Sequence, residues 1–375
     1  MHRYKVVLLV VAIAFLGIAA SGVYVYTLWH RPLGPLLELP TYTPATPAVA
    51  IKPQETITPI KQTPNPTITL TPTAGRSQTV AVTPSANIAG KPLCGGPASM
   101  TILAIGSDQR SEGYTYGLAD SIHVARIDFT VPSVMIIDFP RDLWVEIPGI
   151  SDHHGITHGK INQAYLYGNP GMGYYDGPGE GPGLLARTLD FNFGLRVDHY
   201  LAIDFQTFER MVDAVGGVDV TIEAPVNLNS SHGTPDPNLV LLAGTHHLDG
   251  AVALRLARNR VPSTFQRMIY QKIILSALRE KMLTPAMFPR LPILVPQFIS
   301  SVQTDLSLSE INKLMCISQE VPAQNILSDS FPQDMFTAEM IYDDNRKVNT
   351  FVYEVDNAQL RAMIADFMNG IWPMP

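Results

Sequence analysis

The stretch DHYLAIDFQTFERMVDAVGGVDVTIEAPV, residues 198–226, decides the fold. Residues 198–205 have the composition of a strand, and residues 206–217 have helical spacing and end in a Gly-Gly stop. Residues 218–226 then return to strand alternation. Strands that alternate with helices are typical of a sheet covered by helices on both faces. We therefore predict an α/β fold, a layered α-β-α domain with a central mixed sheet.

The same alternation of strands and helices runs through the chain from residue 100 onward. Further strands are expected at residues 100–108, 121–129, 133–140 and 347–356. Further helices are expected at residues 183–194, 248–260, 265–283, 287–302, 307–321 and 357–370. No internal repeat is visible.

The N-terminus predicts a membrane anchor. Arg3 and Lys5 precede an uncharged apolar run, residues 6–26, which is about as long as a hydrocarbon core of ~30 Å requires. Basic residues before the run favour an N-terminus inside the cell. The alternative is a cleaved signal peptide with its site at the Ala-Ala-Ser of residues 19–21. We expect an uncleaved single-pass anchor, so that the globular part lies outside the cytoplasm.

Three regions follow from composition. Residues 1–31 form the anchor, and residues 32–92 alternate Pro and Thr with few large side chains, which predicts an extended extracytoplasmic linker. Residues 93–375 are expected to form the globular domain. Hydrophobic residues make up 46% of the chain, so a sizeable core is possible. The formal net charge of −7 argues against a nucleic-acid-binding surface, which is usually basic.

The chain has two cysteines, Cys94 and Cys316. Outside the cytoplasm such a pair can oxidise to a disulfide, which would join the start of the domain to a late helix. The alternative is two unrelated buried thiols.

Polar residues lie at the ends of the predicted strands. Asp108 and Arg110 follow the first strand, Asp120 precedes the second, and Arg141 and Asp142 follow the third. Ligands of open α/β sheets gather outside strand ends, and paired carboxylates suit Mg²⁺, which prefers oxygen ligands. The alternative is that these aspartates only shape turns.

A second polar cluster is basic and lies on two consecutive helices. It comprises Arg255, Arg258, Arg260, Arg267 and Gln271. Arg267 and Gln271 are four residues apart and share a helix face. Guanidinium groups pair bidentately with phosphate oxygens, so the cluster suits a pyrophosphate. The alternative is a solvated helix face.

Together these segments resemble a known family. The motifs that carry the resemblance are ILAIGSD (102–108), ADSI (119–122), DFPRDLWVEIPG (138–149), KINQAYLYG (160–168), residues 198–220, LDGAVALRLARNR (248–260) and FQRMIYQ (265–271). In this order they resemble the LytR-CpsA-Psr family, whose domain is also called the cell envelope-related transcriptional attenuator. The anchor and linker are similar to those of the family, whose members lie outside bacterial membranes.

The resemblance implies a cell-wall phosphotransferase of bacteria. Such an enzyme transfers a glycopolymer from a polyprenyl-pyrophosphate carrier to peptidoglycan and releases polyprenyl phosphate. The resemblance assigns Asp108 and Asp120 to Mg²⁺, and Arg141 and Arg267 to catalysis. It assigns substrate pyrophosphate binding to Arg141, Arg258, Arg260, Arg267 and Gln271, with Arg110 beside them. Metal and arginines would neutralise charge on the transferring phosphoryl group.

A lipid tail needs an apolar channel, which we expect between helices and sheet. The expected lining is Phe191, Phe193, Phe205, Phe208 and Met211, with ordinary core packing as the alternative for each. Asp138 and Asp142 are alternative general bases.

The sequence departs from the family at three positions. Leu118 and Tyr270 stand where members carry arginine, and Thr264 stands where they carry aspartate. Arg110, Arg126 or Arg255 could compensate. A non-catalytic binder of polyprenyl pyrophosphate or wall polymer is therefore the alternative function. A transcriptional regulator, as the older name suggests, conflicts with the exported location and acidic charge.

Overall fold

A six-stranded mixed sheet forms the centre of the protein in the computed structural model, which describes residues 24–40, 91–109, 114–229 and 235–371. The strand order is β11-β6-β1-β2-β3-β12, in which β1–β6 and β3–β12 pair in parallel and the other neighbours pair antiparallel. This confirms the predicted α/β class with a mixed sheet. The strands are β1 (Ser99–Ser107), β2 (Ala119–Asp128), β3 (Ser133–Asp138), β6 (His199–Asp204), β11 (Gln303–Thr304) and β12 (Ile326–Ser328).

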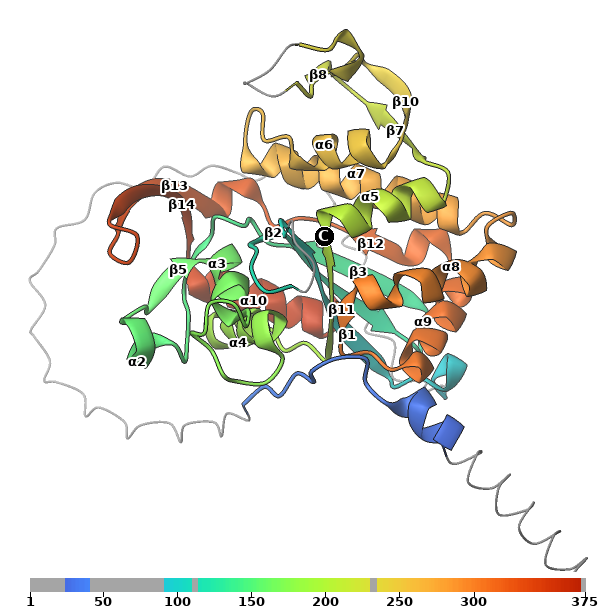
Figure 1. Ribbon diagram of the computed structural model, residues 1–375, viewed down its shortest axis with the longest axis horizontal. Coiled ribbons are helices and arrows are strands. Elements are labelled where there is room, and N and C mark those ends of the chain that lie inside the picture. The colour runs from blue at the N-terminus through green and yellow to red at the C-terminus, as the bar shows by residue number, and fades with distance from the viewer. Residues whose placement is uncertain (1–23, 41–90, 110–113, 230–234, 372–375) are drawn as a thin grey trace, which may run out of the picture. The chain divides into compact units, whose positions relative to one another are not determined.

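One face of the sheet is packed with large aliphatic side chains. Successive side chains of a strand point to opposite faces, and on this packed face they build the large core. Three helices cover it, namely α3 (Ile161–Gly168), α4 (Glu180–Phe193) and α10 (Asn357–Met368), which Figure 1 shows grouped together. The buried sheet residues of this core are Leu103, Ile105, Ala119, Ile122, Val124, Met135, Ile137, Tyr200 and Ala202.

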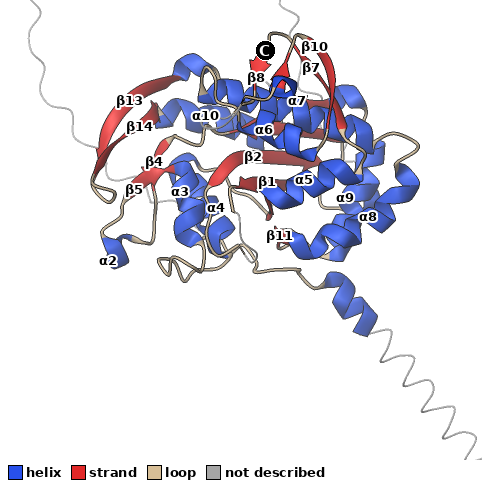
Figure 2. Cartoon of the chain, turned by 45° about the horizontal axis from the view of Figure 1, so that its top comes forward, coloured by secondary structure: helices blue, strands red, loops and turns tan. Residues whose placement is uncertain are grey.

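The opposite face, which we call the cavity face, has two covers. At one end α9 (Leu308–Glu320) packs Ile317 and Val321 against Met100 and Ile127. At the other end lie α5 (Phe205–Ala214), α6 (Gly250–Arg258) and α7 (Thr264–Met282). Helices therefore cover both faces, as predicted, and Figure 2 shows the layers from a second direction.

Residues 198–226 form the expected strand and helix, but their second strand is not part of the central sheet. The Asp204 side chain caps α5 by accepting from Thr207 N at 2.6 Å. The predicted strand 218–226 divides into β7 (Val218–Ile222) and β8 (Val226–Asn227), with Pro225 between them. These strands pair with β10 (Gly244–Leu248) and β9 (Val240–Leu241) in two small sheets, which pack with α5–α7 around a core of their own. Figure 1 shows them at the top.

Several other elements differ from the prediction. The helix expected at 287–302 is broken into η3 (Phe288–Arg290), α8 (Leu291–Phe298) and η4 (Ile299–Ser301) in a proline-rich stretch, since proline removes a helix hydrogen bond. The strand expected at 347–356 is β14 (Val348–Val355), which pairs with an unpredicted strand, β13 (Phe336–Asp343). Other unpredicted elements include α2 (Ser151–His154), α3, the pair β4 (Trp144–Glu146) and β5 (His158–Lys160), and the short strands β9–β12.

Part of the predicted linker packs against the domain. Leu33 N donates to Leu306 O at 3.3 Å, and Tyr200 Oη donates to Pro35 O at 3.0 Å. Leu37 and Leu39 lie against the large core. An extended tether is therefore not observed at the start of the 32–92 region, because its leucines find apolar partners. Most of that region lies outside the described residues.

Most of the predicted anchor also lies outside the described residues, although residues 24–30 are helical. Within the described part of the chain, none of the helices combines the length and apolarity that a membrane crossing needs.

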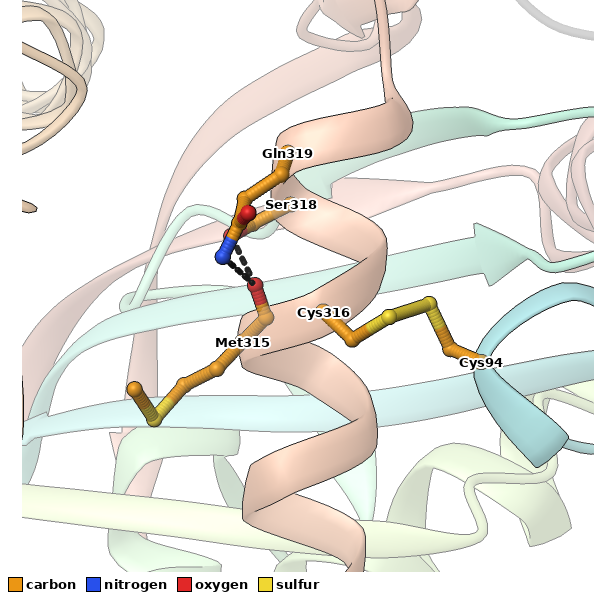
Figure 3. The surroundings of a disulfide bond; sticks show 5 residues. All are labelled: Cys94, Met315, Cys316, Ser318 and Gln319. Carbon is orange, nitrogen blue, oxygen red and sulfur yellow. Dashed lines mark hydrogen bonds between the residues drawn. A yellow bond between two sulfur atoms is a disulfide. The ribbon is translucent and has the colours of Figure 1, made fainter.

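A disulfide joins Cys94 to Cys316 with a Cα–Cα distance of 5.8 Å. Figure 3 shows it bridging η1 (Leu93–Gly95) and α9. The bond fastens α9 over its end of the cavity face, next to the packing of Ile317 and Val321.

Candidate functional site

A β-bulge brings Asp120 onto the cavity face. Gly106 pairs with Ser121 but Ser107 pairs with Ala119, so Asp120 is the extra residue. Ala119 and Ile122 both enter the large core, which leaves two residues between them where regular alternation allows one. Asp120 and Ser121 therefore both face the cavity side. Bulges commonly re-aim a side chain in this way next to functional sites.

Two arginines converge on this carboxylate. Arg141, just past β3, donates from Nη1 to Asp120 Oδ1. Arg267 in α7 lies with Nη2 3.0 Å from Asp120 Oδ2 and donates to Asp120 O at 2.8 Å. Burial would raise the pKa of Asp120, but Arg267 and Arg141 hold it below its ordinary value. The sequence placed these three residues at one site, and the structure brings them into contact.

Arg267 keeps donors for a further ligand. Its side chain is 2% exposed, and its Nε and Nη1 are buried without a hydrogen-bond partner among the described residues. Burial lowers its pKa, and the nearby Arg141 and Arg260 act in the same direction although Asp120 opposes them. An anion would supply both the missing acceptors and the missing negative charge.

Asp142 orients Arg141 from the other side. Its carboxylate accepts from Lys160 Nζ at 2.8 Å and from Thr264 Oγ1 at 3.2 Å, and Arg141 Nε lies 3.5 Å away. Burial would raise the pKa of Asp142, but Arg141 and Lys160 lower it below its ordinary value. A carboxylate held in this way is a weak base, so Asp142 is better suited to positioning Arg141 than to accepting a proton.

The other residues of the second polar cluster lie around Asp120 and the adjoining cavity. Gln271 accepts from Ser121 Oγ at 3.2 Å, beside Asp120. Arg258 lines the same cavity and lies 4.6 Å over the Phe205 ring. Arg260 is exposed but close enough to affect the pKa of Arg267. Arg110 lies outside the described residues.

An apolar cavity of about 440 Å³ adjoins the arginines. It lies between the cavity face and α5–α7, where the sheet presents small residues such as Ala104, Gly106 and Ala125. Arg267, Arg258 and Asp120 belong to its lining, so charged groups and apolar walls share one space. A molecule with an anionic head and an apolar tail matches this distribution.

Two of the five aromatic and methionine residues expected along the channel do line it, namely Phe205 and Phe208. For Phe193 the alternative of ordinary core packing holds, because α4 covers the packed face and buries Phe193 in the large core. Phe191 lies on the same helix. Met211 lies on α5 but is not part of the lining.

The chemistry of Asp108 and Asp120 fits a magnesium ion. Asp108 is held beside the start of β2, since Leu118 N donates to its Oδ1 at 2.6 Å. Asp120 is already ion-paired, but a carboxylate has about four lone-pair sites and so retains acceptor capacity. Among the described residues no group of three or more His, Cys, Asp or Glu side chains could hold a metal. Two carboxylates leave the other positions of a Mg²⁺ ion to water and to oxygens of a bound ligand, which is common for this ion.

The three departures from the family have structural partners here. Tyr270 is 8% exposed and packs in the core of α5–α7. Thr264 donates to Asp142, and Leu118 accepts from Asp108 N through its carbonyl oxygen while its N donates to the Asp108 side chain. Arg126 does not compensate, because it lies toward the far end of β2 and donates to Met368 O at 3.0 Å. Arg255 is exposed on α6.

Two contributors, Lys160 and His123, were not identified from the sequence, and Asp138 was named there only as an alternative general base. Lys160 precedes α3 as its N-cap residue, within a motif whose role there was unassigned. His123 and Asp138 line the cavity from β2 and β3. Their signal was a polar residue at a cavity-facing position of an otherwise apolar strand.

Comparison with known sequences gives relatives over much of the chain. The sequence model of the LytR_cpsA_psr family matches residues 74–367. Regulatory protein MsrR of Staphylococcus aureus (strain COL) is 30% identical over 197 residues, 52% of this chain and 52% of MsrR. Polyisoprenyl-teichoic acid--peptidoglycan teichoic acid transferase TagT of Bacillus subtilis (strain 168) is 27% identical over 224 residues, 57% of this chain and 62% of TagT. The chain thus spans about half the length of the curated relatives it matches.

Solved structures share the fold. The crystal structure of B. subtilis TagV superposes with a TM-score of 0.56 at 24% identity, covering 74% of this chain and 98% of TagV. TagT bound to LIIa-WTA gives a TM-score of 0.51 at 20% identity, covering 73% of this chain and 91% of that chain. Both likenesses support the mixed α/β architecture.

Proposed function

We propose, on the premise that this chain belongs to the LytR_cpsA_psr family, that it is a glycopolymer phosphotransferase of cell-wall assembly. In this proposal it takes a glycopolymer from a polyprenyl-pyrophosphate carrier, transfers it to peptidoglycan and releases polyprenyl phosphate. The observation that carries the proposal is the buried guanidinium of Arg267, whose Nε and Nη1 have no hydrogen-bond partner among the described residues, at an apolar cavity of about 440 Å³. A lipid pyrophosphate has the charge and the apolar length for both.

The names of relatives agree with this substrate class. TagT is named a teichoic acid transferase that acts from a polyisoprenyl carrier to peptidoglycan. MsrR is named a regulatory protein, which does not point to a reaction. Glycopolymer and peptidoglycan are accordingly the partners that we propose for this chain, at the outer side of the cell membrane with residues 1–31 as its anchor.

The proposed reaction uses the charged groups of the site to stabilise the transferring phosphoryl group. An acceptor hydroxyl oxygen bonds to the phosphorus that carries the glycan, and the bond from that phosphorus to the bridging pyrophosphate oxygen breaks. Polyprenyl phosphate leaves with the bonding electrons, and the hydroxyl proton passes to a base. Arg141 and Arg267 stabilise the negative charge that develops on the phosphoryl oxygens. A bound Mg²⁺, held by Asp108 and Asp120, would add to this neutralisation.

Neighbouring residues keep the two arginines in place before substrate arrives. Asp120 holds one nitrogen of each guanidinium group, and Asp142, itself ion-paired with Lys160, lies beside Arg141. Because these groups are pre-oriented, less reorganisation is needed as charge develops. Asp142 is therefore a positioning residue in this mechanism.

The second candidate function is a non-catalytic binder of polyprenyl pyrophosphate or wall polymer. The observation that favours it is the burial of Tyr270 in an apolar core, at a position where the family carries arginine. A binder would use Arg267 and the cavity in the same way, but would not turn the lipid over.

One experiment separates the two candidates. The full chain is incubated with a polyprenyl-pyrophosphate-linked glycan and a peptidoglycan fragment, with and without Mg²⁺, and released polyprenyl phosphate is measured. We expect Mg²⁺-dependent release that falls at least about a hundredfold in Arg141→Ala. The matched control is Arg290→Ala, since Arg290 is an exposed arginine outside the cavity lining. Lipid binding without release, even after long incubation, would identify the non-catalytic binder instead.

A further inference from the structure

The apolar cavity has a carboxylate in its wall. Asp138 ends β3 on the cavity face and is 5% exposed. Its Oδ2 accepts from Ser330 Oγ at 3.1 Å, but its Oδ1 is buried without a hydrogen-bond partner among the described residues. None of the contacts of Arg141, Arg267 and Asp120 described above involves Asp138. An unpaired charge in this position is costly, because little water remains to solvate it.

The groups that face Asp138 do not remove this cost. His123 is its direct partner across β2 and β3. Burial lowers the pKa of His123 to about 4, so this imidazole is neutral near pH 7, and its Nε2 lies 2.8 Å from Ser121 Oγ. Lys272 of α7 also faces the cavity, and its Nζ lies 3.9 Å from Asp329 Oδ1. The carboxylate of Asp329 therefore competes with Asp138 for the lysine charge.

Together these surroundings favour the protonated carboxyl of Asp138 more than bulk water does. Burial raises the pKa of Asp138 to about 6, with Ser330 and Lys272 opposing this shift and Asp329 adding to it. In the empty protein the carboxyl is thus mostly ionised at pH 7, at the wall of a cavity large enough to admit water. A hydrocarbon chain in the cavity would displace that water.

We propose that an isoprenoid tail entering the cavity drives a proton from solvent onto Asp138, so that the protein holds its lipid more tightly as the pH falls. This deepens the proposed function, because it concerns the tail of the same lipid substrate. The change in the protein is one new O–H bond on the carboxylate of Asp138. Asp138 acts on affinity for the tail, whereas Arg141 and Arg267 act on the pyrophosphate.

The direction of the pH dependence follows from linkage. The pKa of Asp138 is higher with the tail bound than without it, so binding takes up a proton. Below the pKa of the empty protein, about 6, the carboxyl is already neutral and affinity is greatest. Above it, affinity falls by up to about tenfold per pH unit until the pKa of the lipid-bound protein is reached.

The test uses a tail without a titratable head. Farnesol is an uncharged isoprenoid alcohol, so any pH dependence of its binding comes from the protein. Its dissociation constant is measured for the full chain in nanodiscs between about pH 5.5 and 8, with empty nanodiscs correcting for partitioning. The decisive variant is Asp138→Asn, which keeps the shape and stays neutral. The matched control is Asp329→Asn, which removes an exposed carboxylate on the same lysine.

We expect weaker binding at high pH for the wild type and for Asp329→Asn, and pH-independent binding for Asp138→Asn. A flat wild-type profile, or an unchanged slope in Asp138→Asn, would overturn the proposal. If Asp138→Asn does not fold, calorimetry of the wild type in two buffers of different ionisation enthalpy measures the proton directly. Uptake near pH 7 supports the proposal, and its absence overturns it.

The outcomes also separate this proposal from the function on which it rests. Release of polyprenyl phosphate without pH-coupled farnesol binding would overturn the role of Asp138 alone. Farnesol binding that takes up a proton, in a protein that releases no polyprenyl phosphate, would support Asp138 and overturn the transferase.

Discussion

The two faces of the central sheet are built from the same strands but carry side chains of different size. On the packed face β1 presents Leu103 and Ile105, which are 0% and 2% exposed. On the cavity face the residues between and beyond them are Ala104 and Gly106. Large side chains bury apolar area and stabilise the fold, whereas small ones leave the space that a ligand can fill. The candidate site therefore lies on the face where small side chains leave space unfilled.

Polar residues follow the same division. Asp120, Ser121, His123 and Asp138 all line the cavity face. Such groups are costly in a closed core but useful beside a ligand or water. The bulge at Asp120 adds one more polar group to this face than regular alternation would. The contrast between the faces leads to four predictions.

The largest effect is expected on the packed face. Leu103→Ala should lower the free energy of unfolding by about 2–5 kcal/mol, because it leaves a void in a core that cannot collapse fully. The measurement is urea unfolding followed by circular dichroism. The matched control is Leu201→Ala, a partly buried leucine that lines the cavity. Equal losses for the two leucines would mean that the faces do not differ in packing.

The next effect concerns the disulfide that fastens α9 over the cavity face. Replacing both Cys94 and Cys316 by serine should lower the free energy of unfolding by about 2–4 kcal/mol, since the bond closes a loop between residues 222 apart. Hydrogen exchange should then rise first in α9, while α3, α4 and α10 remain protected. Uniform loss of protection over both faces would show that the sheet responds as one unit.

The sequence predicted the packed face better than the cavity face. Period-two alternation in β1, β2 and β3 and the helical spacing of α4 depend on burial, which leaves a regular pattern. The cavity face depends on a bulge at Asp120 and on contacts between distant segments, such as Thr264 with Asp142. Neither has a local period. Asp120 and Arg141 were found at strand ends and Arg267 in the basic cluster, and the family resemblance assigned their roles, whereas Lys160 was missed as a site residue.

Short elements escaped prediction for a related reason. β12 has three residues, and it joins the sheet only because β3 offers an open edge. β7 likewise pairs outside the central sheet, with β10, which lies more than twenty residues away in the sequence. Strand pairing of this kind is set by tertiary context more than by local composition.

A smaller effect on stability is expected when the cavity is filled. Ala104→Leu directs a larger side chain into open space, so the free energy of unfolding should change by less than about 1 kcal/mol, below the usual cost of overpacking. Affinity for farnesol should fall at least about tenfold, because the larger side chain takes up cavity volume that the farnesol chain would otherwise fill. Equilibrium unfolding and farnesol binding measure the two quantities. A large loss of stability without loss of binding would place Ala104 in a closed core and break the contrast between the faces.

The smallest effect is expected at the end of the cavity face, where α9 is held by charge as well as by the disulfide. His199 Nε2 lies 3.4 Å from Glu310 Oε1 of α9, and Nδ1 lies 3.4 Å from Asp305 Oδ2. Burial would lower the pKa of His199, but Asp305 and Glu310 raise it above its ordinary value. The folded protein therefore binds this proton more tightly than the unfolded chain does.

The stabilisation from His199 is complete below the ordinary histidine pKa, about 6.5, and is lost as the pH rises through the folded-state value. The free energy of unfolding of the wild type should accordingly decline over this window relative to His199→Gln, which has no proton to lose. Urea unfolding of the two proteins at matched pH values gives the difference. If the difference in free energy of unfolding between the two proteins does not change with pH, His199 contributes through packing. This end of the cavity face would then be stabilised in the same way as the packed face, despite Asp305 and Glu310.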